Sequence, residues 1–421
     1  MGYWRLLLLS LPVAAILLLP SRAPSLKAAD SFVTRSGTQL LLNGQPYRFT
    51  GLNIYNANSD GWCWYAMNSG NALDDALTSI GADKNAFRSW FFQPLATSGG
   101  VRDWSAFDHT LTVAAAHGRR VIVTLTDQWG ECGAGANPVE TSYYKTKDWY
   151  VNGYMSADPG MLASYRDWVA EVVTRYKDNP TVLMWQLTNE AEVKASSGEG
   201  CLPGTESRDV LITWASDVSA LVKSLDANHL VSLGTMGGGQ CGAQFTEYQD
   251  VHAISTIDVC EYHDYSAGSA MPGDQWNGLQ FRITQCNALN KPIFVGESGI
   301  RPVDLGGTPT LQARADAFHQ KLQTQFAAGV KGYVAWAWSS LGSTLDNYDI
   351  GPADPALAVL VPPATPASVG GIAEQPALTP VASAVASSDG RRTARVLGLF
   401  ALLAVTGIIA GVRRVRRRRT A

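Results

Sequence analysis

The sequence predicts an α/β protein built around a single closed (β/α)8 barrel. Eight short apolar runs recur along the chain, and segments of helical period separate most of them. Short strands that alternate with helices indicate a parallel sheet, and eight such units in about 320 residues match a TIM barrel with long βα loops. The runs are residues 47–52, 86–90, 121–126, 182–187, 230–233, 259–262, 292–295 and 332–336.

The elements around these strands follow in order. Residues 32–47 hold two turn signals, Ser36-Gly37 and Asn43-Gly44, between alternating segments, which predicts an N-terminal β-hairpin. A doubly wound open sheet is the alternative, but it would need a glycine-rich phosphate turn that residues 50–53 do not match. The clearest helical segments are residues 104–117, 161–176, 208–225, 275–289 and 311–328.

Both ends of the chain are expected to lie outside the barrel domain, which we assign to residues 30–351. An apolar run after Arg5 is typical of a signal peptide, so residues 1–29 are assigned to one, with the mature chain beginning near Asp30. Residues 352–393 are rich in Pro, Ala, Ser and Val and predict an extended linker. Six arginines follow an uncharged apolar run near the end, which predicts a single transmembrane helix with a basic cytoplasmic tail at residues 394–421.

The charge and the cysteines agree with an exported, surface-anchored domain. Without the three basic residues before Asp30 and the nine after Gly390, the chain keeps 21 basic and 36 acidic residues, a net charge of −15. Such a domain repels nucleic acid, so a neutral substrate suits it better. Six cysteines in an exported chain predict disulfides with 15 possible pairings, and we expect a loop-to-loop bridge between Cys132 and Cys201.

Polar and aromatic residues gather where the predicted strands end. In a (β/α)8 barrel the loops at these ends build the functional site, so the residues should meet at one end of the barrel. The segments are Phe87-Arg88-Ser89-Trp90, Thr126-Asp127-Gln128-Trp129, Thr188-Asn189-Glu190, Tyr262-His263-Asp264-Tyr265, Gly296-Glu297-Ser298 and Trp336-Ala337-Trp338.

Two glutamates at strand ends suit the hydrolysis of a glycosidic bond. One carboxyl must donate a proton to the leaving oxygen, and the other must be ionised to attack the anomeric carbon. Glu190 and Glu297 are the candidates. Aromatic rings complement the apolar faces of sugars, although each ring could equally pack in the core. The candidate rings are Trp62, Trp64, Trp129, Trp149, Tyr150 and Trp338.

The motifs "WQLTNE" and "FVGES", together with "FRSW", "YHDY" and "AWAW", resemble glycoside hydrolase family 5. The resemblance covers residues 32–350 and is to the retaining members, including endo-β-1,4-mannanases and cellulases. It implies that Glu190 is the acid/base, that Glu297 is the nucleophile, and that Asn189 binds the sugar 2-hydroxyl.

The same resemblance implies roles for the residues around the two glutamates. Arg88 and Tyr265 would hold Glu297, and His263 would contact the sugar or Glu190. Trp338 would form the platform under the cleaved sugar, with Trp336 as the alternative because a shift of one residue swaps faces. The chain departs from the family in its third strand, where many members carry a histidine and this one carries residues 127–129, including the substrate-binding candidate Trp129.

The remaining acids and histidines predict little. Glu192 is expected to point to solvent, and Glu131, Asp264 and Glu261 either line the groove or are solvated surface acids. No His-Glu-x-x-His motif occurs, so no metal or other cofactor is expected.

We therefore expect a monomeric, surface-tethered retaining glycosidase that cleaves a β-1,4-linked polysaccharide. Mannan is favoured and glucan comes second, while transglycosylation is not separated from hydrolysis. A retaining mechanism requires carboxyl groups about 5–5.5 Å apart. A non-catalytic glycan-binding protein is the alternative from another class.

Overall fold

The computed structural model describes residues 31–59, 67–132, 144–198 and 200–363. Eight parallel strands form one sheet in the order β10-β9-β8-β5-β4-β13-β12-β11, and a parallel bridge between Ser232 and Val259 closes it. The predicted barrel is confirmed. Its strands are β4 (Phe49–Asn53), β5 (Ala86–Trp90), β8 (Arg120–Thr124), β9 (Val182–Gln186), β10 (Leu230–Ser232), β11 (Cys260–Asp264), β12 (Ile293–Ser298) and β13 (Gly332–Ala335).

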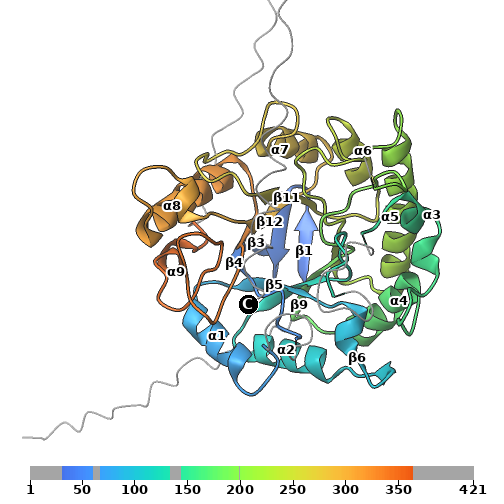
Figure 1. Cartoon of the computed structure of the whole chain (residues 1–421), viewed down its shortest axis with the longest axis horizontal. Coiled ribbons are helices and arrows are strands. Elements are labelled where there is room, and N and C mark those ends of the chain that lie inside the picture. The colour runs from blue at the N-terminus through green and yellow to red at the C-terminus, as the bar shows by residue number, and fades with distance from the viewer. Residues whose placement is uncertain (1–30, 60–66, 133–143, 199, 364–421) are drawn as a thin grey trace, which may run out of the picture. The chain divides into compact units, whose positions relative to one another are not determined.

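Helices surround the strands (Figure 1). The helix expected at residues 161–176 begins four residues later, because the Ser164 side chain accepts a hydrogen bond from the Asp167 backbone N–H and caps the helix there. The helices are α1 (Ala72–Ile80), α2 (Ser105–Ala116), α3 (Lys147–Val151), α4 (Tyr165–Tyr176), α5 (Glu206–Leu225), α6 (Glu247–His252), α7 (Leu279–Ala288), α8 (Leu311–Ala328) and α9 (Ala356–Val359). A short hairpin, β6 (Thr97–Ser98) and β7 (Val101–Arg102), precedes α2.

The predicted N-terminal hairpin is a three-stranded antiparallel sheet of β1 (Val33–Ser36), β2 (Gln39–Leu42) and β3 (Gln45–Tyr47). Its buried side chains Val33 and Leu40 share an apolar cluster with Phe49, Leu183 and Phe294, which lie at or near the N-terminal ends of barrel strands. Figure 1 shows β1 and β3 in front of the barrel strands. The sheet covers the N-terminal end of the barrel, so the functional site is left to the opposite end.

The folded unit extends further than the predicted boundary at residue 351. Asp354 forms a buried ion pair with Arg314 of α8. The Thr50 hydroxyl donates to the backbone carbonyl of Leu360 over 2.9 Å, and Leu360 is fully buried. Residues 354–360, expected in the linker, are therefore part of the barrel unit, because a composition rich in Pro and Ala does not show which of its residues find a buried site.

The predicted signal peptide, most of the linker and the predicted transmembrane helix lie outside the described residues. Within the described ranges, no helix combines the length and the apolar character that crossing a bilayer needs.

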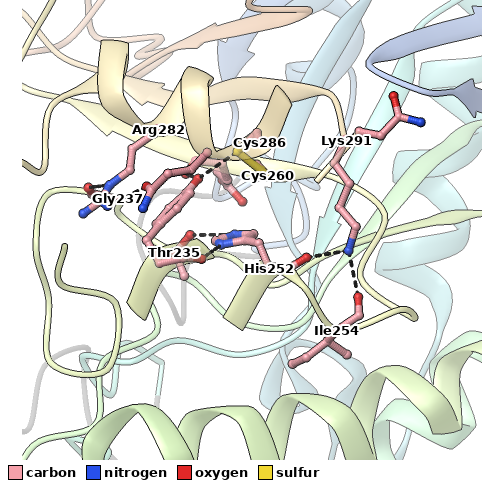
Figure 2. Close-up of a disulfide and its surroundings, with 12 residues drawn as sticks. Thr235, Gly237, His252, Ile254, Cys260, Arg282, Cys286 and Lys291 are labelled. Atoms are coloured by element: carbon pink, nitrogen blue, oxygen red, sulfur yellow. Dashed lines mark hydrogen bonds between the residues drawn. A yellow bond between two sulfur atoms is a disulfide. The ribbon is translucent and has the colours of Figure 1, made fainter. Parts of the chain in front are cut away.

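The disulfides differ from the expected pairing. Cys201 pairs with Cys241, and Cys260 pairs with Cys286, while Cys132 is also disulfide-bonded. The expected Cys132–Cys201 bridge is therefore wrong. Both cysteines were expected in long loops, but this does not show which Cα atoms folding brings within bridging distance. The second disulfide joins β11, a strand that carries site residues, to α7 (Figure 2).

A neutral histidine is buried beside this disulfide (Figure 2). His252 Nδ1 lies 2.7 Å from the Tyr248 backbone carbonyl, and Lys291 Nζ donates to the His252 carbonyl. Burial lowers the pKa of His252 to about 3. The unfolded chain takes up a proton below about pH 6.5, whereas the folded protein does not until far lower pH. Stability contributed by this group is therefore lost as the pH falls from about 6.5 towards 3.

Replacing His252 with glutamine should flatten this pH dependence. The free energy of unfolding should change less steeply between pH 6.5 and 4, by about 1.4 kcal/mol per pH unit, because one proton taken up on unfolding is removed. Urea unfolding at several pH values measures the slope. His319→Gln, on the exposed part of α8, is the matched control. Equal slopes for His252→Gln and the unchanged protein would refute this account of acid unfolding.

Candidate active site

Four of the predicted site residues meet at the C-terminal end of the barrel. Arg88 comes from β5, Glu190 follows β9, His263 lies in β11 and Glu297 lies in β12. Glu190, His263 and Glu297 each place one side-chain atom so that all three atoms lie within 4.8 Å of one another. Strands far apart in the sequence thus bring two carboxylates and an imidazole to one point.

Glu297 is held by two strong donors. Arg88 Nη1 donates to Oε1 over 2.8 Å, and the Tyr265 hydroxyl donates to Oε2 over 2.6 Å. Burial raises the pKa of the Glu297 carboxyl above its ordinary value; the charges of His263 and Arg88 oppose the rise, and the charge of Glu190 adds to it. The two donors and the nearby positive charges favour the ionised form, but burial outweighs them, so this carboxylate binds a proton more readily than a solvated one.

Glu190 is positioned by its backbone and by two donors. Its φ of +60° lies in the left-handed region, which is uncommon for a residue with a side chain and is often found at functional sites. His263 Nδ1 lies 2.7 Å from Oε1, and Trp129 Nε1 donates to Oε2 over 2.5 Å. Burial alone would raise the pKa of Glu190, but the hydrogen bonds from His263 and Trp129 and the charge of His263 bring it below its ordinary value.

Arg88 connects the two halves of the site. Besides Glu297 it donates to the amide oxygens of Asn53, Asn189 and Gln186, over 2.9, 2.6 and 2.8 Å. Its side chain is fully buried. Each arm of the guanidinium has a fixed acceptor, so Arg88 holds the strand ends of β4, β5, β9 and β12 in one arrangement.

Asn189 is oriented from both sides. Its Oδ1 accepts from Arg88, and its Nδ2 donates to Asp127 Oδ1 over 2.8 Å. Asp127 also accepts from the backbone N–H groups of Trp129 and Glu131. The unusual third strand of the sequence thus supplies a carboxylate that fixes Asn189 and a tryptophan that contacts Glu190. The sequence singled out Trp129 as a candidate but did not predict the hydrogen bonds of Asp127.

His263 lies among three carboxylates. Its Nδ1 is 2.7 Å from Glu190 and 3.6 Å from Glu297, and its Nε2 is 3.2 Å from Glu261. Burial opposes ionisation, but the charges of Glu297 and Glu190 and the hydrogen bonds with Glu190 and Glu261 raise the pKa of His263 to about 10. The imidazole is therefore positively charged at neutral pH.

The aromatic platform predicted at Trp338 is wrong. Trp338 is 4% exposed and packs in the main core, so its ring does not face the open end of the barrel. Trp336 is partly exposed, stacks on Tyr55 at 5.0 Å between ring centroids, and lies close to Trp90. Of these two tryptophans, the alternative Trp336 is therefore the one with an accessible ring. Alternation along a strand does not determine which way residues just past its end point.

Of the other aromatic candidates that the structure describes, one lies beside Glu190 and two pack in the core. Trp149 and Tyr150 pack with Trp214 in the main core and are not free rings in the groove. Trp129 contacts Tyr144 edge to face with centroids 5.2 Å apart, beside Glu190. Trp62 and Trp64 lie outside the described residues.

The acids expected at the surface are mostly buried. Glu192 is 7% exposed rather than solvated: it accepts from the Tyr144 hydroxyl over 2.8 Å and pairs with Lys194. Asp264 forms a buried ion pair with Lys321, and Glu261 is fully buried beneath His263. These expectations were wrong because burial of an acid depends on donors from distant segments. The partly buried Glu131 donates its backbone N–H to Asp127.

A single group of three acidic or imidazole side chains in the described part of the chain is close enough to hold a metal ion, and it is Glu190, His263 and Glu297 themselves. Arg88 and Tyr265 already occupy one oxygen each of Glu297. A positive guanidinium and an imidazolium at this point disfavour a cation, so the donor set fits acid–base chemistry better.

The comparisons with known proteins agree with this geometry. A family model described as GH family 5 beta-mannosidase-like matches residues 140–270. Mannan endo-1,4-beta-mannosidase A of Hypocrea jecorina is 27% identical over 76% of this chain and 72% of its own length. These similarities are to glycoside hydrolase family 5, and within that family to the endo-1,4-β-mannanases.

Two further similarities limit and support this assignment. The chain covers 62% of the Neosartorya fischeri protein named "Probable mannan endo-1,4-beta-mannosidase F", at 25% identity over 65% of this chain. The endo-1,4-beta-mannanase structure from Rhizomucor miehei covers 79% of this chain and 97% of its own, with a TM-score of 0.60 and 22% identity. This second likeness shows that the two proteins share the barrel fold of the family.

Proposed function

We propose that this chain is a family 5 retaining glycosidase that cleaves β-1,4-linked mannan. The observation that carries the proposal is the pairing of Glu190 and Glu297, with carboxylate oxygens within 4.8 Å of each other. Two carboxyls this close suit direct attack on the sugar, whereas inversion needs room for a water between them. The named mannan endo-1,4-β-mannosidases among the relatives support mannan as the substrate.

The proposal gives each glutamate the role that the resemblance to family 5 implies. Glu297 attacks the anomeric carbon while the glycosidic C–O bond breaks, and Glu190 transfers its proton to the leaving oxygen. Water then attacks the glycosyl ester and gives its proton to Glu190, which frees Glu297. In the site without substrate, burial raises the pKa of Glu297, and the hydrogen bonds from His263 and Trp129 bring the pKa of Glu190 below its ordinary value. The acid role therefore requires that the bound sugar, by excluding water, raise the pKa of Glu190 so that it holds the proton it transfers.

The hydrogen bonds of Glu190 also suggest which oxygen carries the proton. Oε1 accepts from His263, whereas Oε2 accepts from the indole N–H of Trp129. The charged imidazole keeps Oε1 occupied, so the free lone pair of Oε2 is the position for the transferred proton. We therefore assign Trp129 to the side of the leaving sugar, and Trp336 to the cleaved sugar, as the resemblance implies for the tryptophan after the eighth strand.

A substrate panel with product analysis tests the proposal. The purified protein, incubated with β-1,4-mannan, carboxymethylcellulose and xylan, should release reducing ends fastest from mannan. NMR of the first product formed should show the β-anomer, as double displacement requires. A first-formed α-anomer would overturn retention, and faster release from the cellulose derivative would reassign the substrate. Retention on a mannan gel without hydrolysis of any polymer would instead establish a binding protein.

We also propose that the barrel acts outside the cell on a membrane anchor. Support comes only from the sequence of residues 394–421, where arginines directly follow an apolar run, and from the apolar run near the start. Fractionation of producing cells should place the full chain with membranes. Release of activity by an external protease would support an outward-facing barrel, and activity that stays protected in intact cells would contradict it.

A further inference from the structure

The interior of the barrel holds a third glutamate that the mechanism above does not use. Glu261 lies in β11, two residues before His263, and its side chain is fully buried. Successive strand residues face opposite sides, so Glu261 and His263 both point into the barrel. An acid in a barrel interior is costly unless donors surround it.

Three donors surround the Glu261 carboxylate. The Gln186 side-chain amide donates to Oε1, the Ser232 hydroxyl donates to Oε2 over 2.8 Å, and His263 Nε2 lies 3.2 Å from Oε1. The neighbouring strand makes room for it, because a Cβ atom at Gly296 would lie 1.9 Å from Oε1. A carboxyl group that only accepts hydrogen bonds is in its ionised form.

Two carboxyl groups face the two ring nitrogens of His263. One ring nitrogen faces Glu190 at 2.7 Å and the other faces Glu261 at 3.2 Å. Both neighbours accept, so both nitrogens must donate, and a neutral imidazole with one N–H cannot satisfy them. The carboxylate below thus orients the ring and favours its charged form.

We propose, on the basis of the proposed function, that Glu261 is a positioning residue that keeps His263 doubly protonated and aimed at Glu190. Without the charge of Glu261, the imidazole would lose its acceptor at Nε2 and could become neutral. Nδ1 could then accept a hydrogen bond from Glu190 instead of donating one. The carboxyl proton would be drawn to Oε1, away from the leaving oxygen.

The charged groups that face this pair come from several strands of the barrel. His263 faces Glu190 after β9, Glu297 on β12 and Glu261 on its own strand, and Arg88 on β5 reaches Glu261 only through Gln186. Tyr248 on α6 contacts the backbone carbonyl of Glu261 and not the carboxylate. Without the Glu261 charge, only the carboxylates of Glu190 and Glu297 face His263.

Glu261→Gln tests the proposal with little change in shape. The loss of one negative charge should shift the alkaline limb of the kcat profile on mannan by about 1–3 pH units towards lower pH, since the coupled groups release protons more easily. At pH 7 kcat should fall about 10–100-fold with a smaller change in KM, as expected when a group acts through a catalytic residue. An unchanged profile in the folded variant would overturn the proposal.

A second readout does not depend on activity. The ring nitrogens of His263, assigned by comparison with His263→Asn, should show an imidazolium at pH 8 in the unchanged protein and a neutral ring in Glu261→Gln. A neutral ring in the unchanged protein, or a charged ring in both, would refute the proposal even if no polysaccharide were cleaved. Failure to cleave any polysaccharide, with the expected NMR result, would count against the proposed function alone.

Asp226→Asn is the matched control. Asp226 Oδ2 lies 2.6 Å from His229 Nδ1, and both side chains are buried, so this pair also joins a carboxylate to an imidazole. It lies at the N-terminal side of β10 and contacts none of the residues of the site. The control should lower the melting temperature but leave the kcat profile as it was. A shift of equal size in the control would show that loss of any buried carboxylate moves the profile.

Discussion

Replacing Glu297 with alanine should lower kcat on mannan by about 10⁴-fold or more, because the attacking oxygen is removed and no other described side chain can take its place. Glu190 and His263 lie within 4.8 Å of it but hold the proton-transfer side of the site. Initial rates with mannan, measured on protein of unchanged melting temperature, give the loss. Near-normal turnover would remove Glu297 from the mechanism.

Azide distinguishes the two glutamates. In Glu297→Ala a small anion can occupy the vacated space and attack from the same side, which gives an α-glycosyl azide from an aryl mannoside. In Glu190→Ala the ester on Glu297 still forms from an aryl mannoside with a good leaving group, and azide then displaces it to give the β-product. Reversed products would exchange the two roles. Glu171→Ala, at an exposed ion pair with Arg102 on the outer surface, is the control that should keep full activity.

Arg88→Lys should have the second largest effect. The positive charge is kept, but one ammonium cannot reach Glu297, Asn53, Asn189 and Gln186 at once, as the guanidinium does. Misplacement of Glu297 and Asn189 by even about 1 Å is expected to lower kcat about 100-fold. Steady-state kinetics on mannan measure the loss, with the melting temperature recorded for the same samples.

Arg314→Lys is the control for losing a buried guanidinium. Arg314 is fully buried on the outer helix α8 and pairs with Asp354, which is not one of the site residues. Both variants should lose stability, because each leaves buried acceptors without their donors. Only Arg88→Lys should lose activity per folded molecule. Equal loss of kcat in both variants would show that Arg88 acts through stability alone.

The barrel and its two catalytic candidates were predictable because the signals are local. Each strand is a short apolar run; Glu190 lies just beyond β9, and Glu297 is the last residue but one of β12. The C-terminal ends of parallel strands meet at one end of the barrel, so strand assignment alone brought these glutamates together with Arg88 and His263. The helix α8 was predicted with the same limits that the structure shows.

Predictions failed where they depended on which distant residues surround a side chain in the folded protein. Trp338 and Trp336 are two residues apart, and the sequence could not decide which ring reaches the site. Glu192 and Glu261 were expected at the solvated surface, but both are buried. Donors from other strands and loops make this possible. The cysteine pairs likewise required distances between segments 40 and 26 residues apart.

The sequence by itself determined the α/β barrel, the end of it that carries the site, and the two glutamates with their arginine, because periodicity and strand ends are properties of neighbouring residues. The tertiary structure decided the hydrogen bonds that set protonation: Trp129 on Glu190, Asp127 on Asn189, and Glu261 beneath His263. These pairs join residues 61, 62 and 2 positions apart. Even the last pair depends on the space left by Gly296 of the next strand, since the pKa of a buried group is set by the groups that folding places around it.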